Sequence, residues 1–197
     1  MKKTALVSGL AAMIFVARVS LFLVLILVAG AGLVHGQRVS LEVKAQYFQS
    51  SDGDFRDIYG PGVSFGGEID VSLSGGLGLW AGGHYFSREG KLTFTEEETR
   101  IRISPFYGGI RFRFGKGKVL PYVGAGIGLF SFKEENPIGT VSGSAFGYIG
   151  QGGLIFRIGR RMFLDLKGSY ASSKANPAGI VGQIGGFLVG LGVGVLL

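Results

Sequence analysis

Residues 186–197 read Gly-Phe-Leu-Val-Gly-Leu-Gly-Val-Gly-Val-Leu-Leu, and this stretch decides the fold. An apolar side chain stands at every second position, and glycine fills most positions between them. Because successive side chains of a β-strand point to opposite faces, a period of two predicts a strand. One face of this strand is apolar, and the other carries few side chains because most of its positions are glycine. The apolar positions are Phe187, Val189, Leu191, Val193, Val195 and Leu197.

The same alternation recurs from residue 38 onward, interrupted by clusters of turn-forming residues. Sustained helical periodicity is not found in this part of the sequence. The runs indicate about eight strands of ~10 residues, joined alternately by short turns and longer loops. The predicted fold class is therefore all-β, a closed antiparallel up-and-down barrel. Within residues 100–114 the alternation slips near Pro105, which predicts a β-bulge there.

Composition narrows the class of protein. The chain has 197 residues, of which 37 are glycine, 47% are hydrophobic and only 17% are charged. This apolar content is too high for a disordered chain. Absence of cysteine excludes thiolate metal sites and cysteine nucleophiles. The formal charge is +7, but three of the basic residues lie within the first 36 residues and the rest are scattered, so we do not expect nucleic-acid binding.

The first 36 residues are typical of a signal peptide. Lys2 and Lys3 give a positive start, and residues 21–29 form the strongest apolar run. Small residues follow, and the sequence Val-His-Gly that ends at Gly36 suits a signal peptidase. We therefore predict a cleaved signal peptide at residues 1–36.

Arg18 interrupts this leader, and a true translation start at Met13 would explain its position. An uncleaved membrane anchor is the alternative. However, the uninterrupted run of residues 19–34 is shorter than the ~20 residues that a spanning helix needs. The remaining residues, 37–197, are predicted to form an outer-membrane β-barrel domain.

Alternation alone does not say which face of the barrel meets water, since a soluble lipocalin-like barrel turns its apolar face inward. Three observations favour a membrane barrel. Glycines fall mainly on the charged face, as a narrow interior filled by large side chains requires. The last strand has no polar tail. Aromatic residues recur near strand ends on the apolar face, like the girdles at membrane interfaces: Tyr47, Phe65, Tyr85, Phe114, Tyr148, Phe156, Tyr170 and Phe187.

The stretch Pro121-Tyr-Val-Gly-Ala-Gly-Ile-Gly-Leu129 resembles a strand of the small outer-membrane barrels of the OmpA-like, OmpX and opacity-protein type. Residues 108–114, residues 164–170 and the closing strand are similar as well. The resemblance covers 38–197 and implies a multi-pass location in the bacterial outer membrane. It also implies periplasmic chaperones and the barrel-assembly machinery as partners, with the closing strand as assembly signal, although Leu197 departs from the family's closing Phe.

Charged side chains on the inner face are expected to pair across the lumen, because an isolated buried charge is costly. An eight-stranded barrel is filled by side chains, so we expect no wide pore. The alternative is a narrow conduit or a small apolar pocket lined by Trp80, Phe48, Phe130 and Phe132. The predicted lumen ion-pair network is Glu42, Lys44, Glu68, Asp70, Arg102, Arg111, Arg113, Asp165 and Lys167.

Catalysis has little support in the sequence. His84 is the one histidine after the leader, and no nucleophile motif accompanies it, so a lipid A-modifying enzyme is only a second alternative. We expect no catalytic residues, metal or cofactor. Asp52, Asp54 and Asp57 superficially resemble a Ca²⁺ loop but lack its remaining ligand spacing, so a cation-binding loop at these residues is the alternative to ordinary solvated loop charge.

The longer loops are acidic, whereas the short turns are basic. We therefore expect a monomeric, non-enzymatic barrel that acts in envelope structure or in surface interaction through acidic extracellular loops. Outer-membrane lipid and lipopolysaccharide are its expected surroundings. The loop carboxylates are Asp52, Asp54, Asp57, Glu89, Glu96, Glu97, Glu98, Glu134 and Glu135.

Overall fold

The computed structural model describes residues 38–91, 97–137, 139–175 and 182–197. The leader predicted at 1–36 and the carboxylate Glu96 lie outside this part. Among the described residues no helix has the length and apolarity to cross a membrane. The elements in chain order are β1 (Arg38–Ser50), α2 (Gly53–Tyr59), β2 (Gly62–Ser72), η1 (Ser74–Gly76), β3 (Leu77–Lys91), β4 (Glu98–Arg113), β5 (Val119–Asn136), β6 (Gly139–Ile158), β7 (Met162–Ala175), β8 (Gly182–Gln183) and β9 (Gly186–Leu196).

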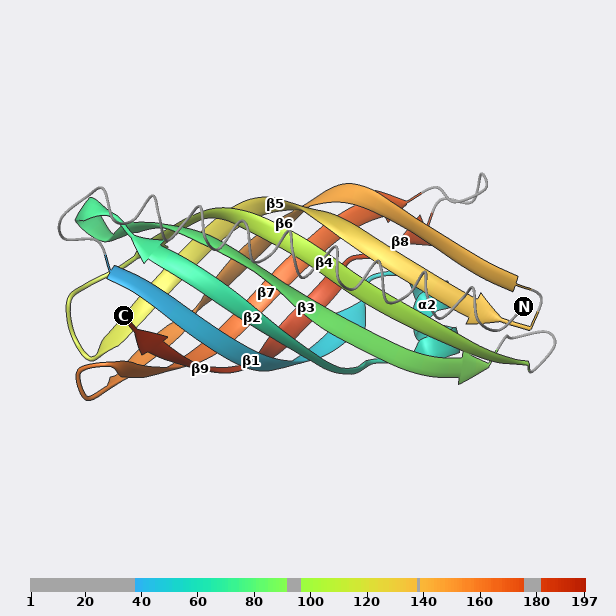
Figure 1. The fold of residues 1–197 in the computed structure, drawn as a ribbon, viewed down its shortest axis with the longest axis horizontal. Coiled ribbons are helices and arrows are strands. Elements are labelled where there is room, and N and C mark those ends of the chain that lie inside the picture. The colour runs from blue at the N-terminus through green and yellow to red at the C-terminus, as the bar shows by residue number, and fades with distance from the viewer. Residues whose placement is uncertain (1–37, 92–96, 138, 176–181) are drawn as a thin grey trace. The chain divides into compact units, whose positions relative to one another are not determined.

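Eight long strands form one closed antiparallel barrel (Figure 1). Each strand from β1 to β7 pairs with the next, and β9 pairs with both β7 and β1 to complete the circle. The two-residue strand β8 extends the end of β7. All neighbours in the barrel are consecutive along the chain except at the β1–β9 seam. The predicted fold class is confirmed.

Apolar side chains face outward over the middle of the barrel. In β1 the side chains of Leu41, Val43 and Tyr47 are exposed, whereas those of Glu42 and Lys44 are buried. A soluble barrel would show the reverse. The outward face of β9 is exposed in the same way, at Phe187, Val189, Leu191, Val193, Val195 and Leu197. This apolar band is the surface that hydrocarbon would cover.

Several strands are much longer than the expected ten residues. β4 has 16 residues, β5 has 18 and β6 has 20, against the roughly 9–11 that cross a bilayer. The described carboxylates that the sequence placed in the loops after residues 87 and 133 lie mostly in strand extensions: Glu89 in β3, Glu98 in β4, and Glu134 and Glu135 in β5. Beyond Leu129 the outward side chains of β5 are polar, so this end of the barrel, here called the loop end, projects past the apolar band.

The predicted bulge at Pro105 is wrong. Gly83 of β3 pairs with Phe106 and Phe86 pairs with Ile103, so the register is the same on both sides of the proline. Pairing of β4 with β5 is continuous as well. What changes at Pro105 is the chemistry of the two faces. Toward the loop end the interior becomes apolar, and the outer wall meets water and becomes polar.

A short helix lies where the sequence predicted only a polar loop. The Asp52 side chain caps α2 by accepting a hydrogen bond from the Phe55 amide at 3.1 Å. Such caps satisfy amides that have no partner inside the helix. Asp52 also accepts a hydrogen bond from the Gln183 amide at 3.2 Å, which ties the helix to the β7–β9 connection. Figure 1 shows α2 at the loop end of the barrel.

Candidate functional site

The lumen contains a cluster of charged side chains centred on Glu68 of β2. Lys44 Nζ lies 2.9 Å and Lys167 Nζ 2.6 Å from Glu68 Oε2, and the Arg111 guanidinium pairs with Glu68 Oε1. These four side chains come from β1, β2, β4 and β7, and each is at most 3% exposed. One carboxylate therefore joins opposite walls of the barrel.

Asp70 is the second centre of this charged cluster. It pairs with Arg113 and also with Arg111, whose Nη1 lies 3.3 Å from Asp70 Oδ2. Arg111 stacks over the ring of Tyr122 at 4.4 Å from its centroid. Four carboxylates face four cations in this charged cluster, so its formal charges balance: Glu42, Glu68, Asp70 and Asp165 against Lys44, Arg111, Arg113 and Lys167.

Glycines on neighbouring strands make room for these cations. Lys44, Arg111 and Lys167 each pair in register with a glycine on both sides. Added side chains would collide: a Cβ at Gly153 would lie 2.7 Å from Tyr122 Oη. This arrangement explains why glycine and charge share one face of the sequence pattern. The flanking glycines are Gly66 and Gly192, Gly78 and Gly124, and Gly153 and Gly190, respectively.

Two predicted lumen carboxylates lie beside this centre, and one predicted lumen cation lies elsewhere. Glu42 is 3.7 Å from Lys44 Nζ, and Asp165 accepts a hydrogen bond from Tyr122 Oη at 2.8 Å. Arg102 does not enter the lumen. It lies on the outer wall and pairs with Glu135 at 3.2 Å. Its misplacement follows from the bulge wrongly predicted at Pro105, because Arg102 and Arg111 are an odd number of positions apart and an unbroken strand turns them to opposite faces.

Apolar clusters fill the lumen on both sides of the charges. The outer apolar cluster, at the loop end, is Phe48, Tyr59, Phe86, Ile101, Ile103, Ile184 and Leu188, with Phe55 and Phe132 packed against it. A middle cluster is Trp80, Tyr107, Phe130, Ile149 and Ala171. At the opposite end, here called the turn end, the cluster is Leu120, Tyr122, Ile155 and Phe163. The aromatic residues considered as conduit lining therefore pack against other side chains.

His84 has no catalytic surroundings among the described residues. It is buried, and its Nδ1 lies 3.3 Å from Tyr107 Oη. Ser87 and Glu89, its neighbours in sequence, are exposed on the departing part of β3. A nucleophile, a base and an acid are not brought together here.

The aspartates of the predicted cation loop do not form a site. In the described part of the chain no three His, Asp or Glu side chains come together in a way that could hold a metal ion. Asp52 uses its carboxylate as a helix cap, while Asp54 lies in the first turn of α2. The helix separates side chains that a loop could have gathered.

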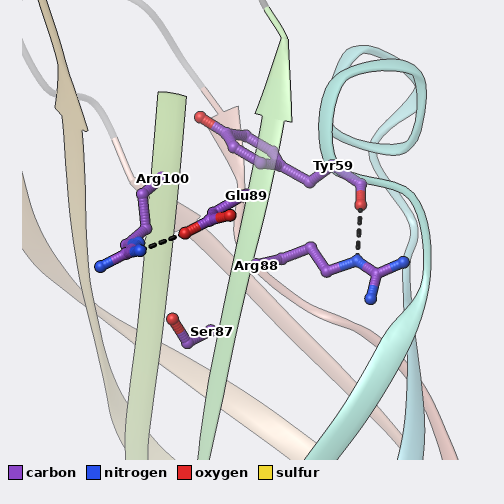
Figure 2. Close-up of a pocket in the computed structure, with 5 residues that line it drawn as sticks. All are labelled: Tyr59, Ser87, Arg88, Glu89 and Arg100. Carbon is purple, nitrogen blue, oxygen red and sulfur yellow. Dashed lines mark hydrogen bonds and ion pairs between the residues drawn. The ribbon is translucent and has the colours of Figure 1, made fainter. Parts of the chain in front are cut away.

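An open depression of about 500 Å³ lies at the loop end between α2 and the ends of β3 and β4. Figure 2 shows Arg100 paired with Glu89, and Arg88 Nε donating to the Tyr59 carbonyl at 3.3 Å. Tyr59 Oη lies 3.0 Å from the Thr99 hydroxyl, and burial raises the pKa of this phenol. The depression is polar, shallow and already internally paired.

A belt of paired charges runs across the outer wall just beyond the apolar band. Lys133 Nζ lies 2.6 Å from Glu135 Oε1, and Arg102 pairs with the same carboxylate. The hydrogen bond from Lys133 holds the pKa of Glu135 below its ordinary value. Likewise, the hydrogen bond from Arg100 lowers the pKa of Glu89. Both carboxylates therefore stay ionised, but each is already paired with a cation of the chain.

Sequence reasoning missed several residues that organise the lumen. Tyr107, Tyr122 and Gln151 are buried beside the charges, and Thr99 is buried at the loop end. Its place in the sequence puts Tyr122 on the same face as the neighbouring glycines, but its hydrogen bond to Asp165 joins residues 43 positions apart. Alternation gives the face of a side chain, and only the shear of the closed barrel gives its partner.

Comparison with known proteins agrees with this geometry. The profile of the outer membrane protein β-barrel domain family matches residues 20–194. A search of curated proteins found no match to this sequence.

Several solved structures share the fold. Neisserial surface protein A is 15% identical, with a TM-score of 0.57 over 81% of this chain and 96% of that chain. Ail, the attachment invasion locus protein of Yersinia pestis, solved in complex with the heparin analogue sucrose octasulfate, is 15% identical, with a TM-score of 0.55 over 80% and 98%. A major outer membrane protein of Thermus thermophilus is 13% identical, with a TM-score of 0.53 over 83% and 100%.

At these identities the likeness concerns the fold alone. The family match, however, spans most of the chain, and the closed barrel with its outward apolar band is the architecture that the family name describes. The chain belongs to the outer membrane protein β-barrel domain family and is an integral barrel of the bacterial outer membrane.

Proposed function

We propose that this protein is a non-enzymatic, non-conducting barrel that serves envelope structure or surface interaction through its loop end. The observation that carries this proposal is the filling of the lumen. Apolar clusters lie on both sides of a charge-balanced network whose side chains are almost fully buried. A conducting path would need water where these side chains pack.

Conductance in planar bilayers tests the filled lumen. Pure refolded protein should give no steady unitary current at moderate voltage. Any reproducible steady current through folded protein, however small, overturns the proposal. The variant F48A/F86A/L188A, which truncates three side chains of the outer apolar cluster, shows which part of the lumen blocks ions. If this variant also gives no current, the charged cluster is sufficient to block ions.

Surface interaction requires that the loop end reach the cell exterior. An epitope inserted after Asn136, between β5 and β6, should bind antibody on intact cells. The matched control is the same epitope at Lys116, between β4 and β5, which should bind only after permeabilisation. Equal labelling of both epitopes on intact cells would contradict the orientation.

We further infer that the belt of paired charges on the outer wall contacts lipopolysaccharide. Arg100, Arg102 and Lys133 lie just beyond the apolar band, where headgroup phosphates are found. The prediction is that R102Q/K133Q weakens copurification of lipopolysaccharide with the protein. The surface pairs contribute little to stability, so the variant should keep the heat-modifiable gel mobility of a folded barrel.

For biogenesis we propose that periplasmic chaperones deliver the chain and that the barrel-assembly machinery reads the outward side chains of β9. V193D should slow assembly in cells. Refolding of V193D into vesicles, where the machinery is absent, separates a recognition defect from simple instability. If both processes slow equally, the assembly-signal role is wrong.

A further inference from the structure

The turn end of the barrel carries an arc of cations without carboxylate partners. Lys116 and Lys118 lie in the turn between β4 and β5, while Arg160 and Arg161 lie in the turn between β6 and β7. In Figure 1 these turns lie at the same end of the barrel as the β9 terminus. All four are exposed, and none forms an ion pair within the described residues.

The structure brings the two turns side by side. The Arg157 amide donates to the Lys118 carbonyl at 2.8 Å, which joins the start of β5 to the end of β6. Arg157 adds a fifth cation to the arc, and it lines a hollow of about 50 Å³ in the barrel mouth together with Arg38. Glycines with positive φ, Gly115 and Gly159, make these turns tight, so the charges stay close to the rim.

Among the described residues no Asp or Glu side chain forms an ion pair with this arc. Asp70 and Asp165, the carboxylates toward this end, are buried in the lumen, where Asp70 pairs with Arg111 and Arg113. The belt at the opposite end differs, because its cations are all paired with a carboxylate of the chain. Like charges repel when they lie within a Debye length of about 8–10 Å, so an anion from outside the chain that lies between these side chains would be attracted to the arc.

The position of the arc indicates the kind of anion. Phe114 and Val119 flank the first turn, Ile158 and Met162 flank the second, and all four side chains are exposed on the apolar outer face. A strand advances about 3.3 Å per residue, so the cations lie within one or two residues of the edge of the apolar band. That is the level of lipid headgroups.

We propose that this arc binds the phosphate groups of anionic phospholipids in the leaflet that the turn end faces, which for short turns is the periplasmic one. Long flexible lysines and arginines can reach headgroups while their turns stay in water. One cation near an anionic headgroup favours the anionic lipid over a neutral one about fivefold at that position. Most lipids around the barrel do not contact the arc, so we expect the average preference for anionic lipid to be about twofold.

The test is the selectivity of the folded protein for spin-labelled lipids in phosphatidylcholine bilayers. Spin-labelled phosphatidylglycerol should be enriched at the barrel relative to spin-labelled phosphatidylcholine. The preference should fall when salt is raised to about 1 M, where the Debye length is about 3 Å. K116Q/K118Q should lose part of it and K116Q/K118Q/R160Q/R161Q most of it, since Arg157 is left in place.

The matched control is K91Q/K174Q, which removes two exposed lysines at the loop end and should leave the preference unchanged. Heat-modifiable mobility shows that each variant is folded. The proposal is overturned if the wild-type protein shows no preference, or if the control loses as much as K116Q/K118Q. It is also overturned if inorganic phosphate abolishes the preference while chloride at equal ionic strength does not, since that marks a discrete site for free phosphate.

Discussion

Glu68 is the residue on which the lumen depends most. It contacts two lysines and an arginine from three other strands, all buried. E68Q keeps the shape of the side chain but leaves three buried cations with less negative charge. We expect it to lower the free energy of unfolding by about 3–5 kcal/mol, the usual cost of breaking a buried ion pair. Urea unfolding in lipid vesicles measures this loss.

The control for this prediction is E89Q, which breaks an exposed pair with Arg100. Exposed pairs contribute little because water and salt screen them. Unfolding curves that superimpose for E68Q and E89Q would show that the lumen charges are individually dispensable. The double variant E68Q/K167M should recover part of the loss, since it removes one of the cations left unpaired.

A second prediction at the residue scale concerns glycine. Gly153 faces the lumen, and a Cβ there would lie against Tyr122. Gly150, on the same strand, has no atom within 4 Å of an added Cβ. G153A should therefore destabilise the barrel by about 1–3 kcal/mol through overpacking, and G150A should not. Thermal or urea unfolding of the two variants decides it, and equal stability of both would contradict the space argument.

Single residues show where prediction from sequence succeeds. The face of Lys44, Glu68, Arg111 or Lys167 follows from parity along a strand, since the period of two is strict. Partners do not follow in this way. Lys167 and Glu68 are 99 positions apart, and their contact depends on how far the strands tilt when the sheet closes. Alternation carries no information about that tilt.

At the scale of elements, β4 explains the main error. Ile101 and Ile103 point inward, whereas Ile110 and Phe112 point outward, on one unbroken strand. If all of β4 is assumed to lie in the membrane, its apolar residues stay on one face only when the alternation shifts by one residue within the strand. The strand instead leaves the membrane, and its outer face passes from hydrocarbon to water. A sequence pattern records polarity, which depends on the surrounding solvent as well as on the face.

The helix α2 was also missed, because its seven residues are too few for a periodic signal. Its stability depends on the Asp52 cap. D52A should speed hydrogen exchange of the α2 amides about fivefold, which corresponds to the ~1 kcal/mol that a cap contributes. NMR of the protein in detergent micelles can measure this exchange.

D54A is the control for the helix prediction, because Asp54 lies within the first turn and does not cap it. Added Ca²⁺ should leave the exchange rates of the wild-type protein unchanged. Slower exchange of the α2 amides with Ca²⁺ would restore the cation-loop interpretation that the structure argues against.

For the whole molecule, the direction of the apolar band is the property on which location depends. Leu191 lies in mid-strand, where it pairs with Ala45 and Leu166, and Leu197 lies beyond the end of β9. Both side chains are exposed. L191R should destabilise the folded protein in vesicles by about 2–4 kcal/mol and L197R by about 0–1 kcal/mol, because the cost of charge falls from midplane to interface.

Unfolding in vesicles measures both variants. If the two arginines cost the same, depth in the bilayer has no influence and the apolar band is not buried in hydrocarbon. If L191R is harmless in vesicles, the sheet must face the other way. Because all strands belong to one closed sheet, these two residues of β9 test which face of the whole sheet meets the lipid.

The seam between β1 and β9 has a kinetic consequence. Ser40 near the start of β1 pairs with Leu196 at the end of β9, so the two halves of the seam meet only after nearly the whole described chain has taken its place. Once they have paired, the barrel has no unpaired edge strand from which the sheet could fray. Unfolding must then break the hydrogen bonds along a whole strand at once. Slow closure and still slower opening are thus two results of one geometry, and a barrel once formed should outlast treatments that unravel sheets with open margins.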